Sequence, residues 1–143
     1  MTATPALQQT AEDFHAMEEA DRLQLLLEFS DELPELPQRY ADHPDLLERV
    51  TECQSPVFLF VEVDDGRVHV HATAPAEAPT TRGFASILAQ GLEGASVEDA
   101  LAVPIDFPRE LGLDRVVSPL RLRGMVGMLG RIQRQIRERA LEH

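Results

Sequence analysis

The sequence contains a single cysteine and no apolar run that approaches the length of a membrane span, which is roughly 20 residues. One cysteine excludes an intramolecular disulfide and a four-cysteine zinc site, so Cys53 must act alone or have no chemical role. The first residues also lack the basic start and apolar core of a secretory signal. These absences predict a soluble, cytoplasmic protein without a membrane partner.

Positive charge is scarce at the start of the chain and concentrated at its end. The formal net charge is −12, and residues 1–65 hold sixteen acidic residues against three arginines, whereas residues 115–143 hold seven arginines against two acidic residues. An acidic protein repels phosphate, which argues against a nucleic-acid partner. The simplest interpretation is a solvated acidic surface with an arginine-rich helix pairing locally, and docking to a partially basic protein is the alternative.

The 143 residues, of which 43% are hydrophobic, suit one compact domain that needs no disulfide or structural metal. We predict a single domain over residues 1–143, with residues 1–10 flexible. Residues 141–143 resemble the start of a vector-encoded histidine tag and are given no functional role.

Apolar residues recur every three or four positions between Thr10 and Leu33, which predicts one long helix or two short ones. Prolines at positions 34 and 37 end this pattern, because proline lacks an amide proton. A short helix is expected over residues 44–50, with Pro44 in its first turn.

Strict alternation predicts a β-hairpin in the middle of the chain, with strands over residues 57–63 and 67–73 joined by an Asp-Asp-Gly turn at residues 64–66. One face of this hairpin is apolar and is expected to be buried by helices. Its members are Val57, Leu59, Val61, Val63, Val68, Val70 and Ala72.

Further helices are predicted after the hairpin. Residues 81–92 have helical periodicity and are followed by Gly94, Ser96 is expected to cap a short helix, and Ser118 to cap the last one. The fold class is therefore α+β, a small antiparallel sheet built on a hairpin and packed against several helices. Glycines recur every three residues in the last helix, which favours close packing of another element against Gly124, Gly127 and Gly130.

Cys53 is the strongest nucleophile candidate, because it lies in a polar loop, residues 51–56, between a predicted helix and the first strand. The alternative is a small buried residue, which is the usual fate of an unpaired cysteine. The polar neighbours Glu52, Gln54 and Ser55 do not look like a core segment.

The stretch VTECQSPVF at residues 50–58 resembles the active-site segment of the SufE family of sulfur acceptors. That family usually has glycine in place of Glu52 and tryptophan in place of Phe58. Two further blocks follow in the family's order. These are EAPTTRG at residues 77–83, where Thr80 and Thr81 replace an aliphatic pair, and residues 111–125, which lead into the last helix.

The resemblance implies that Cys53 takes persulfide sulfur from a cysteine desulfurase, a pyridoxal-phosphate enzyme, and delivers it to an iron–sulfur cluster assembly scaffold. It also associates Arg121 and Glu77 with the cysteine loop. The protein itself would be a sulfur-transfer accessory and desulfurase activator rather than an enzyme, without a cofactor of its own. The sequence leaves open whether it forms a homodimer.

The charges around Cys53 favour a carrier over an independent catalyst. Glu48 and Glu52 are expected to raise the thiol pKa, and only Arg49 is near in sequence to lower it. The rival function, a cysteine-dependent hydrolase or transferase, needs a base paired with Cys53, and no histidine motif supplies one. A third possibility, a binding module without chemistry, requires that Cys53 be dispensable.

His69 and His71 alternate with valines, so their side chains are expected on the same face of the second strand. Two such histidines could bind a metal ion, but no third ligand has suitable spacing. We therefore predict a solvated or helix-covered face and no metal site.

Overall fold

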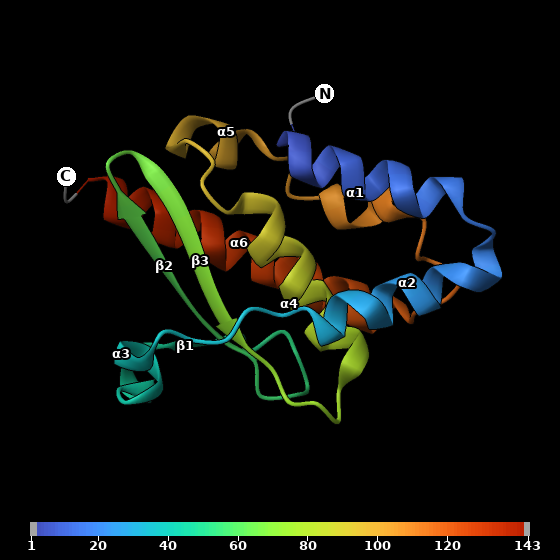
Figure 1. The fold of residues 1–143 in the computed structure, drawn as a ribbon, viewed down its shortest axis with the longest axis horizontal. Helices are drawn as coiled ribbons and strands as arrows, with labels where there is room; N and C mark the ends of the chain where they lie inside the picture. The colour runs from blue at the N-terminus through green and yellow to red at the C-terminus, as the bar shows by residue number, and fades with distance from the viewer. Residues whose placement is uncertain (1–2, 142–143) are drawn as a thin grey trace.

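The computed structural model describes residues 3–141 as one α+β fold in which a hairpin lies against two long helices (Figure 1). This confirms the predicted fold class. The helices are α1 (Pro5–Ala16), α2 (Glu19–Asp31), α3 (Gln38–Ala41), α4 (Pro79–Leu92), α5 (Val97–Ala102) and α6 (Pro119–Ala140), with 3-10 turns η1 (Pro44–Leu46) and η2 (Phe107–Leu111).

The sheet is antiparallel and has the strand order β1 (Glu48–Arg49), β2 (Phe58–Asp64), β3 (Arg67–Thr73). At the tip of the hairpin, Asp65 and Gly66 both have positive φ, as a tight two-residue turn requires. Every residue of the predicted apolar face is less than 10% exposed, which confirms the predicted alternation. Helix α4 contacts β3 and α6 contacts β2, so these two helices cover that face.

Helix α4 is the centre of the molecule, because it contacts α1, α2, α6 and the sheet. Two glycines allow neighbouring helices to approach it closely. A Cβ on Gly83 would lie 2.6 Å from the carbonyl oxygen of Leu26, and one on Gly91 would collide with the side chain of Leu7. The final helix α6 passes behind α4 and the hairpin in Figure 1. The loop that contains Cys53 packs against this helix, as described below.

The helix predicted over residues 44–50 is wrong. Only the 3-10 turn η1 forms, and the chain then extends into β1, where Glu48 pairs with Leu59 and Arg49 with Phe58. A short helix has little stability alone, whereas strand pairing satisfies the same backbone groups against an existing sheet edge. The short helix α3 was not predicted.

The amino-terminal region forms two helices, and the first begins earlier than expected. Helix α1 starts at Pro5 because the hydroxyl of Thr4 accepts a hydrogen bond from the amide of Leu7 and donates one to the carbonyl of Gly91. Leu7 is fully buried, so this part of residues 1–10 packs on the domain, where the sequence predicted flexibility. Of the expected tag remnant, only Leu141 lies among the described residues, and it is exposed.

Candidate functional site

Cys53 lies in the loop that joins β1 to β2, as predicted, although the preceding element is a strand rather than a helix. Its side chain does not face the solvent. The residue is only 8% exposed and belongs to the hydrophobic core cluster. The loop therefore carries a free thiol that is covered in this conformation.

A small cavity of about 40 Å³ adjoins Cys53. Such a volume holds about one water-sized group. Its rim includes Leu120 and Arg121, which are exposed at the start of α6, so the thiol is one layer below the surface. The lining residues are Glu52, Cys53, Gln54, Ser55, Thr81, Leu120, Arg121 and Gly124.

The structure thus places Arg121 at the same cavity as Cys53. The side chain of Ser118 caps α6 by accepting a hydrogen bond from the amide of Arg121, which confirms the predicted helix start. Glu77 differs, because it lies exposed in the turn before α4 and is not among the described residues that line the cavity.

The cysteine loop packs closely against glycines of α6. A Cβ on Gly124 would lie 3.0 Å from the Cys53 sulfur, and a Cβ on Gly127 would lie 2.6 to 2.8 Å from the side chain of Glu52. The predicted close packing is therefore confirmed for these two residues. At Gly130 the nearest atom, Cδ1 of Ile105, is an ordinary 3.5 Å away.

Arg131 lies one helical turn after Gly127, and its side chain binds both the cysteine loop and β1, the strand before it. Its guanidinium donates to Thr51 Oγ1 at 2.7 Å, to Glu52 Oε1 at 2.7 Å and to Glu48 Oε2 at 2.6 Å. Glu48 is also bound by Arg134 and by Gln135. Acidic residues of the first half of the chain and the arginine-rich last helix therefore meet here, a contact that the charge asymmetry alone did not predict.

The thiol is strongly disposed to remain neutral. Burial is the main cause that raises the pKa of Cys53, the charge of Glu52 also raises it, and Arg131 lowers it, and together they leave the pKa at about 11. The predicted direction is therefore confirmed for Glu52. Burial contributes most, which the sequence alone did not predict.

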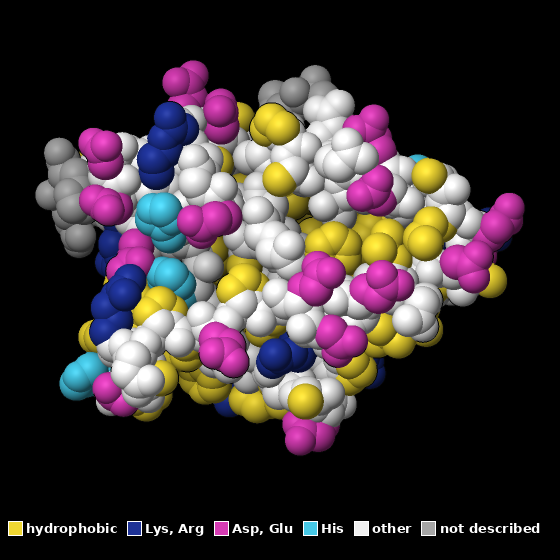
Figure 2. Space-filling view, viewed as in Figure 1, with side chains coloured by type: hydrophobic (Ala, Val, Ile, Leu, Met, Phe, Trp, Pro, Cys, Tyr) yellow, Lys and Arg dark blue, Asp and Glu magenta, His cyan; other side chains and the backbone are white. Residues whose placement is uncertain are grey.

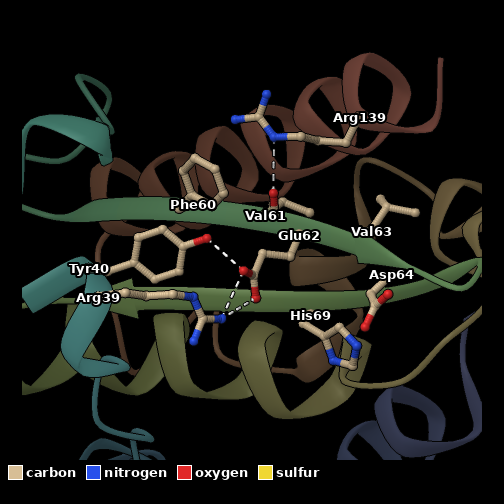
Figure 3. Close-up of a pocket in the computed structure, with 9 residues that line it drawn as sticks. All are labelled: Arg39, Tyr40, Phe60, Val61, Glu62, Val63, Asp64, His69 and Arg139. Atoms are coloured by element: carbon tan, nitrogen blue, oxygen red, sulfur yellow. Dashed lines mark hydrogen bonds and ion pairs between the residues drawn. The ribbon is translucent and has the colours of Figure 1, made fainter. Parts of the chain in front are cut away.

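A second cluster lies on the outward face of the hairpin, along an open cavity of about 580 Å³ (Figure 3). Its centre is the carboxylate of Glu62, which accepts hydrogen bonds from Arg39 at 2.8 Å and from the Tyr40 hydroxyl at 2.7 Å. Arg139 lies over the ring of Phe60 and donates to the carbonyl of Val61.

The two predicted histidines belong to this outward face and take separate partners. His71 lies 2.7 Å from Glu62, whereas His69 lies 2.6 Å from Glu93. Within residues 3–141, no three metal-binding side chains are grouped so that they could hold an ion. The histidines are therefore explained by polar pairing on the sheet.

Reasoning from sequence missed three contributors to the site. Arg131 had no sequence signal beyond the charge of its helix, since its partners lie about eighty residues earlier. Thr81 was noted only as a departure from the family pattern, yet it is buried and lines the cavity. Glu52 was treated as a local charge, while its main contact is with α6.

The surface agrees with the overall charge. Acidic side chains are spread over the face seen in Figure 2, and basic side chains are few there. Among the described residues, no helix combines the length and the apolar character needed to span a membrane.

Comparison with known proteins connects this site to a family. Residues 8–136 match the model of the family described as SufE, Fe-S metabolism associated domain. An uncharacterized SufE-like protein of Mycobacterium tuberculosis is 56% identical over 133 residues, which cover 92% of each chain. SufE-like protein 1 of Arabidopsis thaliana, chloroplastic/mitochondrial, is 28% identical over 132 residues, which are 92% of this chain and 34% of the plant protein.

The fold has a counterpart among solved structures. The solution structure of a hypothetical protein from Thermus thermophilus superimposes with a TM-score of 0.85 at 40% sequence identity, covering 97% of this chain and 98% of that one. The family match, the relatives and this shared fold all span nearly the whole chain. The chain therefore belongs to the SufE family and has a role in Fe–S metabolism.

Proposed function

We propose that this protein is a sulfur carrier that receives persulfide sulfur on Cys53 from a pyridoxal-phosphate-dependent cysteine desulfurase and delivers it to an iron–sulfur assembly scaffold. It acts as an accessory and activator of the desulfurase rather than as an independent enzyme. Its place of action is the cytoplasm, where reducing conditions keep a single thiol free.

The observation that carries this proposal is the position of the only cysteine. Cys53 adjoins a cavity with room for about one additional atom of the size of water or sulfur. Arg121 lines the same cavity, and an arginine there supplies a cation that can attract the negative charge of a persulfide. A cysteine that carries one sulfur atom as a persulfide needs only space for that atom and a cation at the same cavity.

The transfer step balances without an external oxidant or reductant. The Cys53 thiolate attacks the outer sulfur of the partner's persulfide, and a new sulfur–sulfur bond forms on Cys53. The partner's sulfur–sulfur bond breaks, and its cysteine leaves as a thiolate. Delivery to the scaffold is the same exchange with Cys53 as the leaving group.

The resting thiol is poorly suited to react alone, because it is covered and its pKa is raised to about 11. Only the thiolate is a good nucleophile. Docking of the desulfurase must therefore expose the loop before Cys53 can attack. Between encounters, the neutral and covered thiol resists oxidation.

The rival hydrolase or transferase lacks its base. Among the described residues that line the Cys53 cavity there is no histidine, and the carboxylate of Glu52 is bound by Arg131. A nucleophilic cysteine enzyme needs a base within hydrogen-bond reach. The site therefore supports transfer between proteins better than turnover of a small substrate.

The test is Cys53→Ser. Serine nearly preserves the size of the side chain, and its far higher pKa removes the nucleophile. We expect the variant to fold and to bind the desulfurase, yet neither to stimulate it nor to gain sulfur. After incubation with desulfurase and free cysteine, the mass spectrum of the wild type should show a gain of about 32 mass units that a reductant reverses. The same gain on Cys53→Ser would overturn the proposal.

A further inference from the structure

The residues just before Cys53 are held by one arginine of α6. Arg131 bonds the carboxylate of Glu52 through Nε and the hydroxyl of Thr51 through Nη2, each at 2.7 Å. The side chain of Arg131 is 25% exposed and that of Glu52 is 43% exposed. These contacts are partly shielded from solvent, which strengthens them, and they remain accessible to a partner protein that breaks them.

Packing reinforces this contact. The side chain of Glu52 lies directly on Gly127, where any Cβ would collide with it. Arg131 is itself fixed by Glu48, which Arg134 and Gln135 also bind. One end of the contact is therefore anchored to β1 and α6, and the other end is the loop that carries the thiol.

We propose that Glu52 and Arg131 form a latch that keeps the Cys53 loop closed in the free protein, so that both act as positioning residues for sulfur acceptance. This inference rests on the proposed function. The latch adds to the packing of Cys53 on Gly124.

The latch makes opening of the loop a distinct event. Cys53 cannot swing outward as part of residues 51–56 while Glu52 and Thr51 remain bound to Arg131. A docking partner must break these bonds, for example by offering its own cation to Glu52 or its own carboxylate to Arg131. The latch thus links exposure of the thiol to partner binding.

The experiment measures alkylation of Cys53 by iodoacetamide in the isolated full chain, for Glu52→Gln and Arg131→Gln. The two substitutions break the same latch but change the local charge in opposite directions. Loss of Glu52 favours the thiolate, because Glu52 raises the pKa of Cys53, whereas loss of Arg131 disfavours the thiolate. Access and charge therefore predict different results.

If the latch controls access, both variants should be alkylated faster than the wild type, by about fivefold, the factor expected for a pair worth about 1 kcal/mol. If charge alone matters, Glu52→Gln should be faster and Arg131→Gln slower. That result, or unchanged rates in both variants, would overturn the latch.

Two further variants test whether the change in alkylation rate comes from the latch. Arg137→Gln is the control, because it removes an exposed arginine of the same helix that, in the described part of the chain, contacts none of Glu48, Thr51 and Glu52, and its rate should match the wild type. Arg131→Lys keeps the charge but loses the planar fork, so it should also be alkylated faster. It decides the question if thermal melting shows that Arg131→Gln is unfolded.

Alkylation needs no desulfurase, so this test is separate from that of the proposed function. Faster alkylation without sulfur uptake would leave the latch in place and refute the carrier. Sulfur uptake with unchanged alkylation rates would support the carrier and refute the latch.

Discussion

The Cys53 loop and the cluster around Glu62 each place an ionisable group beside arginines, and they control it in opposite ways. Burial and Glu52 raise the pKa of Cys53 to about 11. Burial alone would also raise the pKa of Glu62, but hydrogen bonds from Arg39, Tyr40 and His71 outweigh it and lower the pKa to about 2. The first group is held neutral and the second is held charged.

The difference lies in which partner the arginine contacts. In the outward cluster, Arg39 bonds directly to the titrating carboxylate at 2.8 Å (Figure 3). In the loop, Arg131 bonds to Glu52 and Thr51, the neighbours of the cysteine, and its charge is largely neutralised there. Hence the outward cluster contributes to stability, whereas the loop restrains a reactive group.

The largest expected effect is on stability, from Glu62→Gln. The carboxyl has its ordinary pKa of 4.5 in the unfolded chain and about 2 in the folded protein, so its stabilisation is complete above pH 4.5 and is lost as the pH falls toward 2. At pH 7 we expect a loss on the order of 2 kcal/mol, reduced by solvent screening from the full linkage value.

Urea titrations at a series of pH values provide the check. The difference between Glu62→Gln and the wild type should shrink as the pH falls from 4.5 toward 2, because the carboxyl of the unfolded wild type then binds a proton while that of the folded protein stays charged until about pH 2. Alkylation of Cys53 should be unaffected at pH 7. A constant difference at all pH values would show that the charge of Glu62 is not what stabilises the cluster.

Arg121→Ala should have the opposite effect to Glu62→Gln, because it should slow sulfur uptake and leave stability unchanged. Removing a cation from the cavity that would hold the persulfide should slow sulfur uptake about tenfold, the factor for roughly 1.4 kcal/mol. An exposed substitution should change the free energy of unfolding by less than about 0.5 kcal/mol. Sulfur uptake is read by mass spectrometry and stability by thermal melting.

The matched control is Arg123→Ala, which removes another exposed arginine two positions along α6 that is not among the described residues lining the cavity. Its uptake should equal that of the wild type. Equal losses in both variants would point to general charge attraction, and a fall in stability that parallels the loss of uptake would return Arg121 to a structural role.

The smallest expected effects come from two glycines of the same helix. In Gly127→Ala the new Cβ displaces Glu52, so alkylation of Cys53 should become about threefold faster, an effect within the range of an exposed ion pair. In Gly130→Ala the new Cβ meets only Ile105 at 3.5 Å. Alanine is the better helix former by about 0.5 to 1 kcal/mol, so this variant should melt higher without a change in alkylation.

Much of the fold could be predicted because its signals are local. The alternation from Val57 to Ala72 predicted the hairpin and its buried face, and Ser96 and Ser118 both cap helices as expected. Strand β1 could not be predicted in this way, because Glu48 and Arg49 have no alternation and form a strand only by pairing with β2.

By itself, the sequence determined the family, the fold class, the identity of the sole thiol and its place in a polar loop. Each depends on the order and type of residues that are near one another in the chain. Only the tertiary structure decided that Cys53 is covered, that Arg121 and Thr81 share its cavity, and that Arg131 binds Glu52. These contacts join segments up to about eighty residues apart, and burial, which contributes most to the pKa of the thiol, exists only once those segments pack.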